Sequence, residues 1–449
     1  MAVGPADLAT MNEEAYRIIG GRPLRGAVRL SGSKNGALPT LAATLLVDGE
    51  TILENVPRIS DVQTMLELLE AVGMRVEIRG DGGVAITNTG ITTHRAPREL
   101  VGKMRASHYL LGPTLAKLGK AESAQTGGCA IGARPLAYIM EALAPLGVEC
   151  LDCNDRVEVS TAGLVGGRVV LDPKFRSSGA TFTVLMAAAL AKGTTVIEHG
   201  SYEPDVVHFC EFLNRCGADI EGIGTATLTV RGVKELRGTT HRINSDRLEA
   251  GTLICAAAAT RGEALVGPIT REDLAETAGK LEEAGVELGA SGDGLLARCA
   301  VRPRAVDVVT DPFPAFSTDL QPPFAAVLAT AEGSSTIRET VFDDRLQYVG
   351  ELVKMGARAE MVDSRCVVIE GVERLRGAEV EGRNIRDGAA LVIAALSAEG
   401  ESRVAGRQYL ARGYERLDEK LRELGAEIGA QCSASLETTS PQRRKGRKG

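Results

Sequence analysis

The sequence of 449 residues has no tryptophan, and its aromatic residues are limited to seven tyrosines and eight phenylalanines. Proteins that bind single-stranded nucleic acid stack the bases on aromatic side chains, so this scarcity argues against that class of protein. A formal net charge of −7 also disfavours a nucleic-acid scaffold, and any anion site must be built locally from basic side chains. We therefore expect no nucleic-acid partner.

Long apolar runs are also missing. The two longest, 184–191 and 389–396, are far shorter than the roughly 20 residues that a membrane-spanning helix needs. Residues 1–14 are acidic and lack the basic start and apolar run of a signal peptide. The nine cysteines are scattered and odd in number, which suits a reducing compartment better than a disulfide framework. These features predict a cytoplasmic protein without membrane contact.

Motifs for metals and common cofactors are absent from the sequence as well. There is no Walker loop, and no predicted strand leads into a GxGxxG turn, which disfavours nucleoside triphosphate hydrolysis and nicotinamide chemistry. Cys150 and Cys153 form a single CxxC without a second pair at zinc spacing, and the five histidines show no metal or triad spacing. We expect neither a metal nor a cofactor.

What the sequence does contain is an internal repeat. Six glycines each follow a short apolar or small residue at the end of an amphipathic stretch, and they are separated by 74, 70, 68, 71 and 69 residues. These are Gly73, Gly147, Gly217, Gly285, Gly356 and Gly425. Such even spacing predicts six copies of one structural unit of about 70 residues.

Each copy follows a common order of elements. A helix of small residues, such as 185–190, runs into a glycine turn and a β-branched strand. Helices that are apolar on every side should be buried, whereas amphipathic ones such as 61–71 and 415–424 should cover the outside. Each unit is then strand, buried helix, strand, outer helix, strand. Because single cores rarely grow past ~250–300 residues, six units predict an α/β fold of two three-unit domains.

The stretch 126–135 combines three glycines with a thiol at Cys129 and a guanidinium at Arg134. Glycine allows the backbone to approach a ligand closely, and arginine suits phosphate or carboxylate. The loop is thus a candidate for a reactive sulfur beside an anion site. Taken alone, so short a pattern is more often a glycine-rich connection with a structural cysteine.

The starts of the buried helices carry polar or basic residues, in segments 31–36, 103–105, 175–179 and 384–388. Helix N-termini present unpaired N–H groups and a partial positive charge to anions. One such site is usually an ordinary cap. Several related by the repeat predict a pocket for a substrate with several anionic groups.

Together these residues carry a family resemblance. The motifs are Ser31–Pro39 (SGSKNGALP), Met104–Ser107, Gly127–Pro135, Ser178–Thr181, Asp246-Arg247, Phe316–Gln321, Val341-Phe342 and Arg412–Glu415. From about Arg17 to Ile428 the chain resembles the UDP-N-acetylglucosamine 1-carboxyvinyltransferases, enolpyruvyl transferases that act early in peptidoglycan synthesis. The resemblance implies a two-domain inside-out α/β barrel, with residues 34–245 in one domain and 16–33 plus 246–431 in the other. The remaining ends, 1–15 and 432–449, would be disordered tails.

The resemblance also implies roles for individual residues. Lys34, Arg134 and Arg412 would bind the phosphate and carboxylate of phosphoenolpyruvate. Cys129 would give a proton to the methylene carbon of that substrate, or form a covalent phospholactoyl adduct. Asp319 would act as general base toward the sugar hydroxyl. No metal is required, because fixed cations supply the electrostatic stabilisation.

The nucleotide sugar would be held by a further set of residues, again by resemblance. These are Asn35, Arg105, Arg134, Pro135, Leu136, Ser177, Ser178, Gly179, Val341, Phe342, Arg345 and Arg386.

The sequence departs from the family pattern at four places. Ala137 replaces the usual aspartate of the uridine segment, and Asn384 replaces a carboxylate near the active site. Ala411 stands where an aspartate usually precedes the late arginine, and Phe175-Arg176 stands where a lysine is common. The four expected catalytic residues are intact, so these changes bear on the acceptor.

Three functions are therefore compared. The leading hypothesis is transfer of enolpyruvyl from phosphoenolpyruvate to the 3-hydroxyl of UDP-N-acetylglucosamine with release of phosphate, the first committed step of peptidoglycan synthesis and the target of fosfomycin. The first alternative is the same donor with another nucleotide acceptor such as UMP, as in nucleoside-antibiotic pathways, which Ala137 and Asn384 favour. The second is a catalytically silent protein that binds nucleotide sugar, which the intact set Lys34, Cys129, Asp319 and Arg412 argues against.

Overall fold

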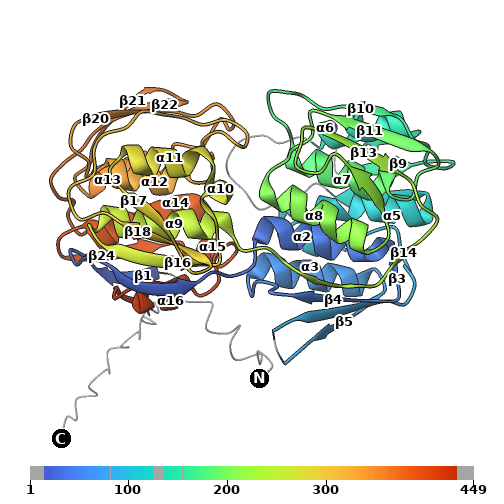
Figure 1. Cartoon of the computed structure of the whole chain (residues 1–449), viewed down its shortest axis with the longest axis horizontal. Helices are drawn as coiled ribbons and strands as arrows, with labels where there is room; N and C mark the ends of the chain where they lie inside the picture. The colour runs from blue at the N-terminus through green and yellow to red at the C-terminus, as the bar shows by residue number, and fades with distance from the viewer. Residues whose placement is uncertain (1–14, 81, 125–135, 154–155, 432–449) are drawn as a thin grey trace, which may run out of the picture.

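The computed structural model describes residues 15–80, 82–124, 136–153 and 156–431. They form two lobes, each with its own hydrophobic core (Figure 1). One core draws its side chains from residues 37–243, and the other from 16–30 and 248–428. The chain passes between the lobes twice, and the two crossings lie side by side, because Gly32 and Ser245 form an antiparallel bridge.

The described residues include six small sheets that share one pattern of strand order. Two neighbouring strands run parallel, and the third and fourth are antiparallel to their neighbours. In the second sheet the Arg95–Glu122 parallel bridge stands in place of the first strand. In sheet order the strands are β15 (Thr240–Arg242), β4 (Glu50–Glu54), β6 (Val84–Asn88), β5 (Met74–Ile78); β7 (Lys120–Ala124), β9 (Arg156–Ser160), β8 (Glu149–Asp152); β10 (Arg168–Val170), β11 (Thr194–Glu198), β13 (Thr227–Arg231), β12 (Asp219–Glu221); β2 (Arg25–Arg29), β16 (Glu263–Gly267), β18 (Gly294–Arg298), β17 (Glu287–Ser291); β19 (Val308–Val309), β20 (Ser334–Arg338), β22 (Cys366–Glu370), β21 (Arg358–Asp363); and β23 (Glu379–Glu381), β24 (Glu401–Ala405), β1 (Ala15–Ile19), β25 (Glu427–Gln431). A further pair is β14 (Leu236–Arg237) with β3 (Val47–Asp48).

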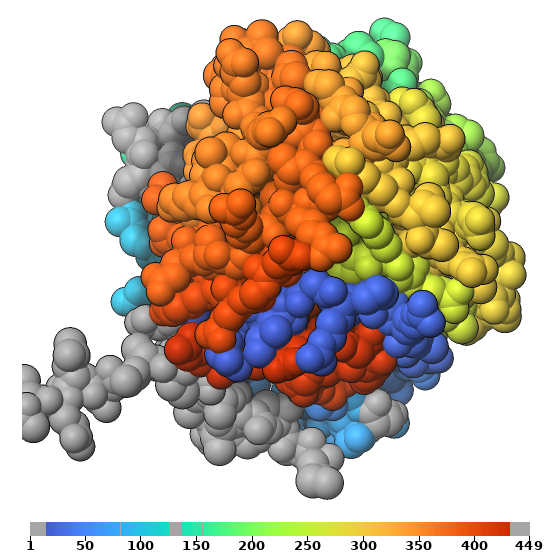
Figure 2. All heavy atoms as spheres, turned by 90° about the vertical axis from the view of Figure 1, so that its left-hand side faces the viewer, coloured from blue at the N-terminus to red at the C-terminus, as the bar shows by residue number. Residues whose placement is uncertain are grey.

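The N-terminal strands complete two of these sheets. β1 lies between β24 and β25, and β2 pairs in parallel with β16. Figure 2 shows the first described segment of the chain, in blue, lying against the last described segment, in red, on the surface of this lobe. Ala15, expected in the N-terminal tail, is therefore the first residue of a strand, whereas residues 1–14 and 432–449 lie outside the described residues.

The helices of small residues are buried along most of their length, as their composition predicts. They are α2 (Lys34–Ala43), α5 (Leu111–Leu118), α7 (Ser178–Ala188), α9 (Arg247–Ala259), α12 (Gln321–Leu328) and α14 (Ile385–Ser397). In the second lobe α9, α12 and α14 pack against one another in the interior (Figure 1). Their approach is close: a Cβ on Gly251 of α9 would lie 2.6 Å from Cδ1 of Leu320.

The amphipathic helices lie farther from the centre and expose one side. They are α3 (Ser60–Ala71), α6 (Ala137–Leu143), α8 (Pro204–Arg215), α11 (Glu276–Glu283), α13 (Val349–Lys354) and α16 (Leu417–Glu423). Short helical turns complete the set: η2 (Thr44–Leu46), α4 (Arg98–Val101), η3 (Arg105–Leu110), η4 (Ala144–Leu146), α10 (Arg271–Leu274) and α15 (Arg407–Leu410). Within the described ranges no helix combines the length and apolarity needed to cross a membrane.

The six glycines of the repeat all adopt positive φ, between 76° and 108°. Each ends an outer helical segment, and the chain then turns into a strand. Positive φ is a backbone conformation that residues with a side chain disfavour.

The mixed α/β class is confirmed, but the predicted unit is one strand too short. After the outer helix the chain forms an edge strand and then returns antiparallel into the middle of the sheet, as β5 and β6 do. In the last unit β1 supplies that returning strand.

Candidate active site

A cavity of about 830 Å³ lies between the lobes and is lined by residues of both. Among the predicted site residues it brings together are Lys34, Asn35, Arg105, Ser177, Ser178, Gly179, Asp319, Val341, Phe342, Arg345, Arg386 and Arg412. Leu136 is not in this lining; its side chain is buried in the core of residues 37–243. Cys129, Arg134 and Pro135 lie outside the described residues.

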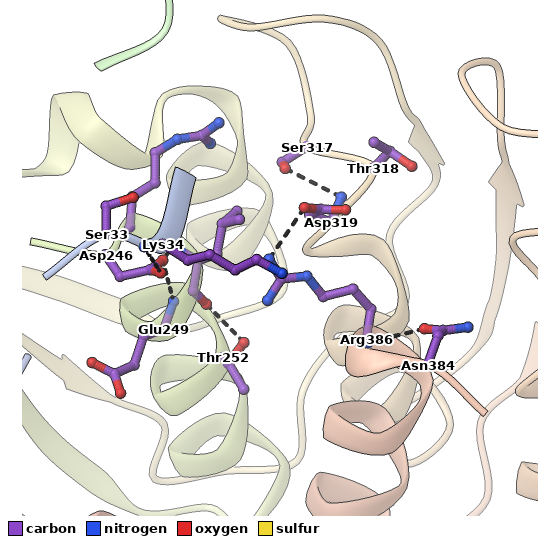
Figure 3. Close-up of polar contacts among 12 residues, drawn as sticks. Ser33, Lys34, Asp246, Glu249, Thr252, Ser317, Thr318, Asp319, Asn384 and Arg386 are labelled. Carbon is purple, nitrogen blue, oxygen red and sulfur yellow. Dashed lines mark hydrogen bonds and ion pairs between the residues drawn. The ribbon is translucent and has the colours of Figure 1, made fainter. Parts of the chain in front are cut away.

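The crossings between the lobes fix the start of α2 and hence Lys34. Asp246 caps α9, because its Oδ1 accepts hydrogen bonds from the N–H groups of Leu248 (2.8 Å) and Glu249 (3.0 Å). Its Oδ2 accepts from the N–H of Lys34 at 3.3 Å (Figure 3). Ser33 caps α2 by accepting from the N–H of Gly36 at 3.2 Å. One carboxylate therefore joins two helix N-termini from different lobes.

Lys34 and Arg412 share a carboxylate that sequence reasoning missed. Nζ of Lys34 lies 2.6 Å from Oδ2 of Asp61, and Nε of Arg412 lies 2.9 Å from Oδ1. Burial of Asp61 opposes its charge, but the two cations outweigh burial and hold its pKa below the ordinary value of 3.8. Asp61 thus places side by side the two cations expected to bind phosphoenolpyruvate, one from each lobe.

This contact between the lobes does not use the side chain of Ala411. The carbonyl oxygen of Ala411 accepts a hydrogen bond from the N–H of Ser60 at 3.1 Å, next to the Asp61–Arg412 pair. The departure from the family pattern at this position therefore leaves a backbone contact in place.

Asp319 also lines the cavity and lies between two arginines. Arg345 bonds its Oδ1, and Nη2 of Arg386 lies 3.2 Å from its Oδ2 (Figure 3). The Asp319 side chain remains 27% exposed, whereas those of the arginines are 2% and 7% exposed. The carboxylate is therefore oriented by buried donors while part of it faces the cavity.

Arg386 is held in turn by a hydroxyl pair. Its Nη1 donates to Oη of Tyr414 at 2.9 Å, and that oxygen lies 2.8 Å from Oγ1 of Thr252. Burial disfavours the charge of Arg386, but Tyr414, Asp319 and Asp246 outweigh burial and raise its pKa. The residue is a fixed cation throughout the ordinary pH range.

Asn384, the other departure near these charges, caps α14. Its Oδ1 accepts from the N–H groups of Arg386 and Asp387, both at 3.0 Å. Its Nδ2 is buried without a hydrogen-bond partner among the described residues. Asparagine and aspartate cap helices equally well, so the cap is preserved while one negative charge beside the cavity is lost.

The start of α7 forms another wall of the cavity. Ser177 caps the helix by accepting from the N–H of Ala180 at 3.3 Å, and Ser178 bonds Glu203. A Cβ on Gly179 would lie 3.3 Å from Nε2 of His108, so a larger residue at this position would crowd the imidazole. Burial lowers the pKa of His108 to about 4, and its imidazole is therefore neutral at pH 7.

Arg176, in the segment where the family commonly has lysine, also lines the cavity. Its guanidinium donates to Oη of Tyr202 at 3.0 Å and lies 5.4 Å from the centre of that ring. A cation is thus retained at this position by a different residue type.

A further contact between the lobes, also missed from sequence, borders the cavity. Nη2 of Arg247, at the start of α9, lies 2.6 Å from Oε2 of Glu203. Nearby, the rings of Tyr202 and Phe313 meet edge to face with centroids 5.9 Å apart. Arg247 belonged to a motif of the resemblance, but Glu203 stands in no motif, and only the fold brings the pair together.

In the described part of the chain, no three His, Cys, Asp or Glu side chains gather as metal ligands would. Cys150 and Cys153 are both free thiols.

Comparison with known proteins finds that the chain is similar to enolpyruvyl (carboxyvinyl) transferases. A family model described as EPSP synthase (3-phosphoshikimate 1-carboxyvinyltransferase) matches residues 18–421. UDP-N-acetylglucosamine 1-carboxyvinyltransferase 1 of Caldanaerobacter subterraneus subsp. tengcongensis is 43% identical over 406 residues, covering 90% of this chain and 97% of that protein. The crystal structure of the enolpyruvyl transferase NikO from Streptomyces tendae is similar with a TM-score of 0.84 at 28% identity, covering 93% and 99% of the two chains. EPSP synthase from Acinetobacter baumannii, at 18% identity and a TM-score of 0.67 over 93% and 100% of the chains, shares the fold.

Proposed function

The chain belongs to the UDP-N-acetylglucosamine 1-carboxyvinyltransferase family of enolpyruvyl transferases, and we propose that it transfers enolpyruvyl from phosphoenolpyruvate to the 3-hydroxyl of UDP-N-acetylglucosamine, releasing phosphate. The observation that carries this proposal is the arrangement of one cavity. Lys34 and Arg412 are held together by Asp61, and Asp319 is held by two buried arginines. Cations for the donor and a base for the acceptor thus line the same space.

The residue roles form part of the proposal. Lys34, Arg412 and Arg134 bind the phosphate and carboxylate of phosphoenolpyruvate, the arginines as planar forks and the lysine as a point charge. Cys129 gives a proton to C3 while the acceptor oxygen bonds to C2, and Asp319 takes the proton of that hydroxyl. The product of this addition is a tetrahedral ketal. Cleavage of the bond between C2 and the phosphate oxygen, with return of a proton from C3 to the Cys129 thiolate, restores the double bond and releases phosphate.

The acceptor is placed across the start of α7 and the loop that contains Val341 and Phe342. Ser177, Ser178 and Gly179 provide hydrogen-bonding groups suited to a diphosphate at a helix N-terminus. Asn35, Arg105, Arg345 and Arg386 complete the proposed set, with Pro135 in the uridine segment. Leu136 is left out, because its side chain is buried in the core.

The finer architecture belongs to the same proposal. We assign the fold as a two-domain inside-out α/β barrel of six units, with residues 34–245 as one domain and 16–33 plus 246–431 as the other. Two separate cores and the buried α9, α12 and α14 support this division. Contacts Asp61–Arg412 and Glu203–Arg247 join the domains around the cavity, as an enzyme that excludes water from a ketal requires. The proposed reaction is the first committed step of peptidoglycan synthesis, which takes place in the cytoplasm.

A second candidate acceptor is a nucleotide without the amino sugar, such as UMP. The similarity to NikO supports enolpyruvyl transfer in general, and the changes at Ala137 and Asn384 favour an altered acceptor. Against this alternative stand the higher identity and equal coverage of the UDP-N-acetylglucosamine 1-carboxyvinyltransferases. The enol ethers of the two acceptors differ in mass, so the mass of the product distinguishes them.

Replacing Cys129 with serine tests the transfer chemistry. The thiol is the more acidic group and the stronger nucleophile, so Cys129→Ser should abolish covalent labelling by the epoxide fosfomycin. Turnover should fall at least 10²-fold, since general acid catalysis typically contributes ~10²–10⁴-fold. Intact-protein mass spectrometry detects the label, and phosphate release measures turnover. The cysteines at 150 and 153 serve as controls, and a Cys150→Ser variant should label like the parent. Equal labelling of Cys129→Ser and the parent would show that another residue reacts.

A further inference from the structure

Glu339 is a buried carboxylate outside the cavity that connects two of its walls. It follows β20, and only 1% of the residue is exposed. Its Oε1 accepts hydrogen bonds from the N–H groups of Val341 (2.8 Å) and Phe342 (3.0 Å). Its Oε2 accepts from Oγ1 of Thr318 at 2.9 Å.

The two segments joined by these bonds face the same space. Val341 and Phe342 line the cavity from one loop, and Thr318 and Asp319 line it from another. The loops are separated by more than twenty residues of sequence, and they meet at the side chain of Glu339. The side chain of Glu339 therefore links the 341–342 loop to the segment that carries Asp319.

Arg345 forms a second connection between the same loops. Its Nε and Nη2 donate to the carbonyl oxygen of Thr318 at 3.3 and 3.2 Å, and it also bonds Asp319. Its guanidinium lies 5.6 Å from the centre of the Phe342 ring. The backbone of residue 318 is held by Arg345, and its hydroxyl by Glu339, so the orientation of Asp319 depends on both.

The charge of Glu339 matters to this arrangement. The three donors that it accepts from are neutral, and removing a carboxylate from water is costly unless such bonds replace the lost hydration. Hydrogen bonds to an ionised acceptor are about twice as strong as those between neutral groups. A carboxylate therefore fixes the two loops more firmly than an amide of the same shape.

We propose that Glu339 is a positioning residue that couples the acceptor-binding loop at 341–342 to the catalytic base Asp319. The inference rests on the proposed function, since it assumes that Asp319 is the base and that the 341–342 loop contacts the acceptor. Acceptor bound on the loop then orients the base. Binding of phosphoenolpyruvate to Lys34 and Arg412 does not depend on Glu339, because these cations are held by Asp61 and the side chain of Glu339 bonds Thr318, Val341 and Phe342 instead.

Glu339→Gln, which keeps the shape and removes the charge, tests the coupling. We expect KM for the acceptor to rise about tenfold and kcat to fall about tenfold, with KM for phosphoenolpyruvate within about twofold of the parent. In an Asp319→Asn background the effect on kcat should vanish, while the effect on acceptor affinity, measured by calorimetry, should persist. Glu360→Gln, at an exposed glutamate of β21 in the same sheet, should match the parent.

Thr318→Val provides a second test, because it removes only the bond between the hydroxyl and Oε2 of Glu339. This variant should lower kcat at least threefold while leaving acceptor affinity unchanged. If Glu339→Gln does not fold, the kcat of Thr318→Val tests whether Glu339 positions Asp319. Equal changes in KM for both substrates, or a lowered unfolding temperature without a change in kinetics, would make Glu339 merely structural and overturn the proposal.

Turnover of the parent is measured first, with UDP-N-acetylglucosamine and with UMP. A parent inactive with the amino-sugar nucleotide overturns the proposed function, and the coupling is then decided with the nucleotide that is converted or bound.

Discussion

Replacing Asp319 with asparagine is expected to lower kcat for enolpyruvyl transfer by about 10²–10⁴-fold, the usual contribution of a general base. The amide keeps the shape, but its single oxygen replaces only one of the two carboxylate oxygens that accept from Arg345 and Arg386, and the amide cannot take the hydroxyl proton. KM for phosphoenolpyruvate should stay close to that of the parent, because the proposed donor cations Lys34 and Arg412 pair with Asp61, whereas Asp319 is paired with Arg345 and Arg386. Single-turnover phosphate release measures the chemical step.

Ser317→Ala is the matched control for this substitution. It removes the hydroxyl that accepts the N–H of Asp319 at 3.3 Å and leaves the carboxylate in place. We expect less than a tenfold change in kcat for this control. A fall of less than tenfold for Asp319→Asn would place the base elsewhere.

Replacing Asp61 with asparagine should destabilise the unliganded protein. The side chain of Asp61 is 5% exposed and pairs with both Lys34 and Arg412, so the substitution leaves two cations without their shared anion. Breaking a buried ion pair by removing one partner typically costs about 3–5 kcal/mol. At about 2–4 °C per kcal/mol, the midpoint of thermal unfolding should fall by roughly 6–20 °C.

The same variant should be rescued by substrate. Phosphoenolpyruvate or inorganic phosphate supplies the missing negative charge, so either should raise the unfolding temperature of Asp61→Asn more than that of the parent. Glu401→Gln is the control, because the Glu401–Arg17 pair is about half exposed and such surface pairs contribute ~0–1 kcal/mol. Equal stabilisation of parent and Asp61→Asn by phosphate would show that these cations do not bind the donor.

The dependence of this effect on pH has a definite sign. The folded-state pKa of Asp61 lies below 3.8, so its contribution to stability is complete above the unfolded value. The contribution is lost as the pH falls through the folded value. The difference between parent and Asp61→Asn should therefore be constant from neutral pH to about pH 4 and should shrink only in stronger acid.

The repeat and the buried helices were predictable from sequence because both depend on local composition. A glycine such as Gly285 is required wherever a helix must turn sharply into a strand, and α9 is buried because its residues are small or apolar on every side. The returning strand of each unit was missed, since it continues an edge strand after a short turn and carries no helical landmark. The placement of β1 between β24 and β25 joins the two ends of the chain, and no local pattern indicates it.

The site residues were likewise predictable only where a local sequence pattern marks them. Lys34, Asp319 and Arg412 stand in motifs, Arg386 stands at one of the polar helix starts, and most residues inferred with them line one cavity. Asp61 occupies the first turn of α3, where an acidic residue is favoured by the helix dipole in any protein, so its role cannot be recognised locally. Glu203 and Glu339 are likewise ordinary in sequence, and only packing between distant segments brings them to Arg247 and Thr318.

The most direct test of the central claim is the mass of the product formed when limiting phosphoenolpyruvate is offered equal concentrations of UDP-N-acetylglucosamine and UMP. The account predicts the enolpyruvyl ether of UDP-N-acetylglucosamine, with one phosphate released for each product molecule. Exclusive formation of enolpyruvyl-UMP would contradict it and would assign the changes at Ala137 and Asn384 to acceptor choice. Binding of nucleotide sugar without release of phosphate would contradict it as well, by showing a protein that binds but does not catalyse.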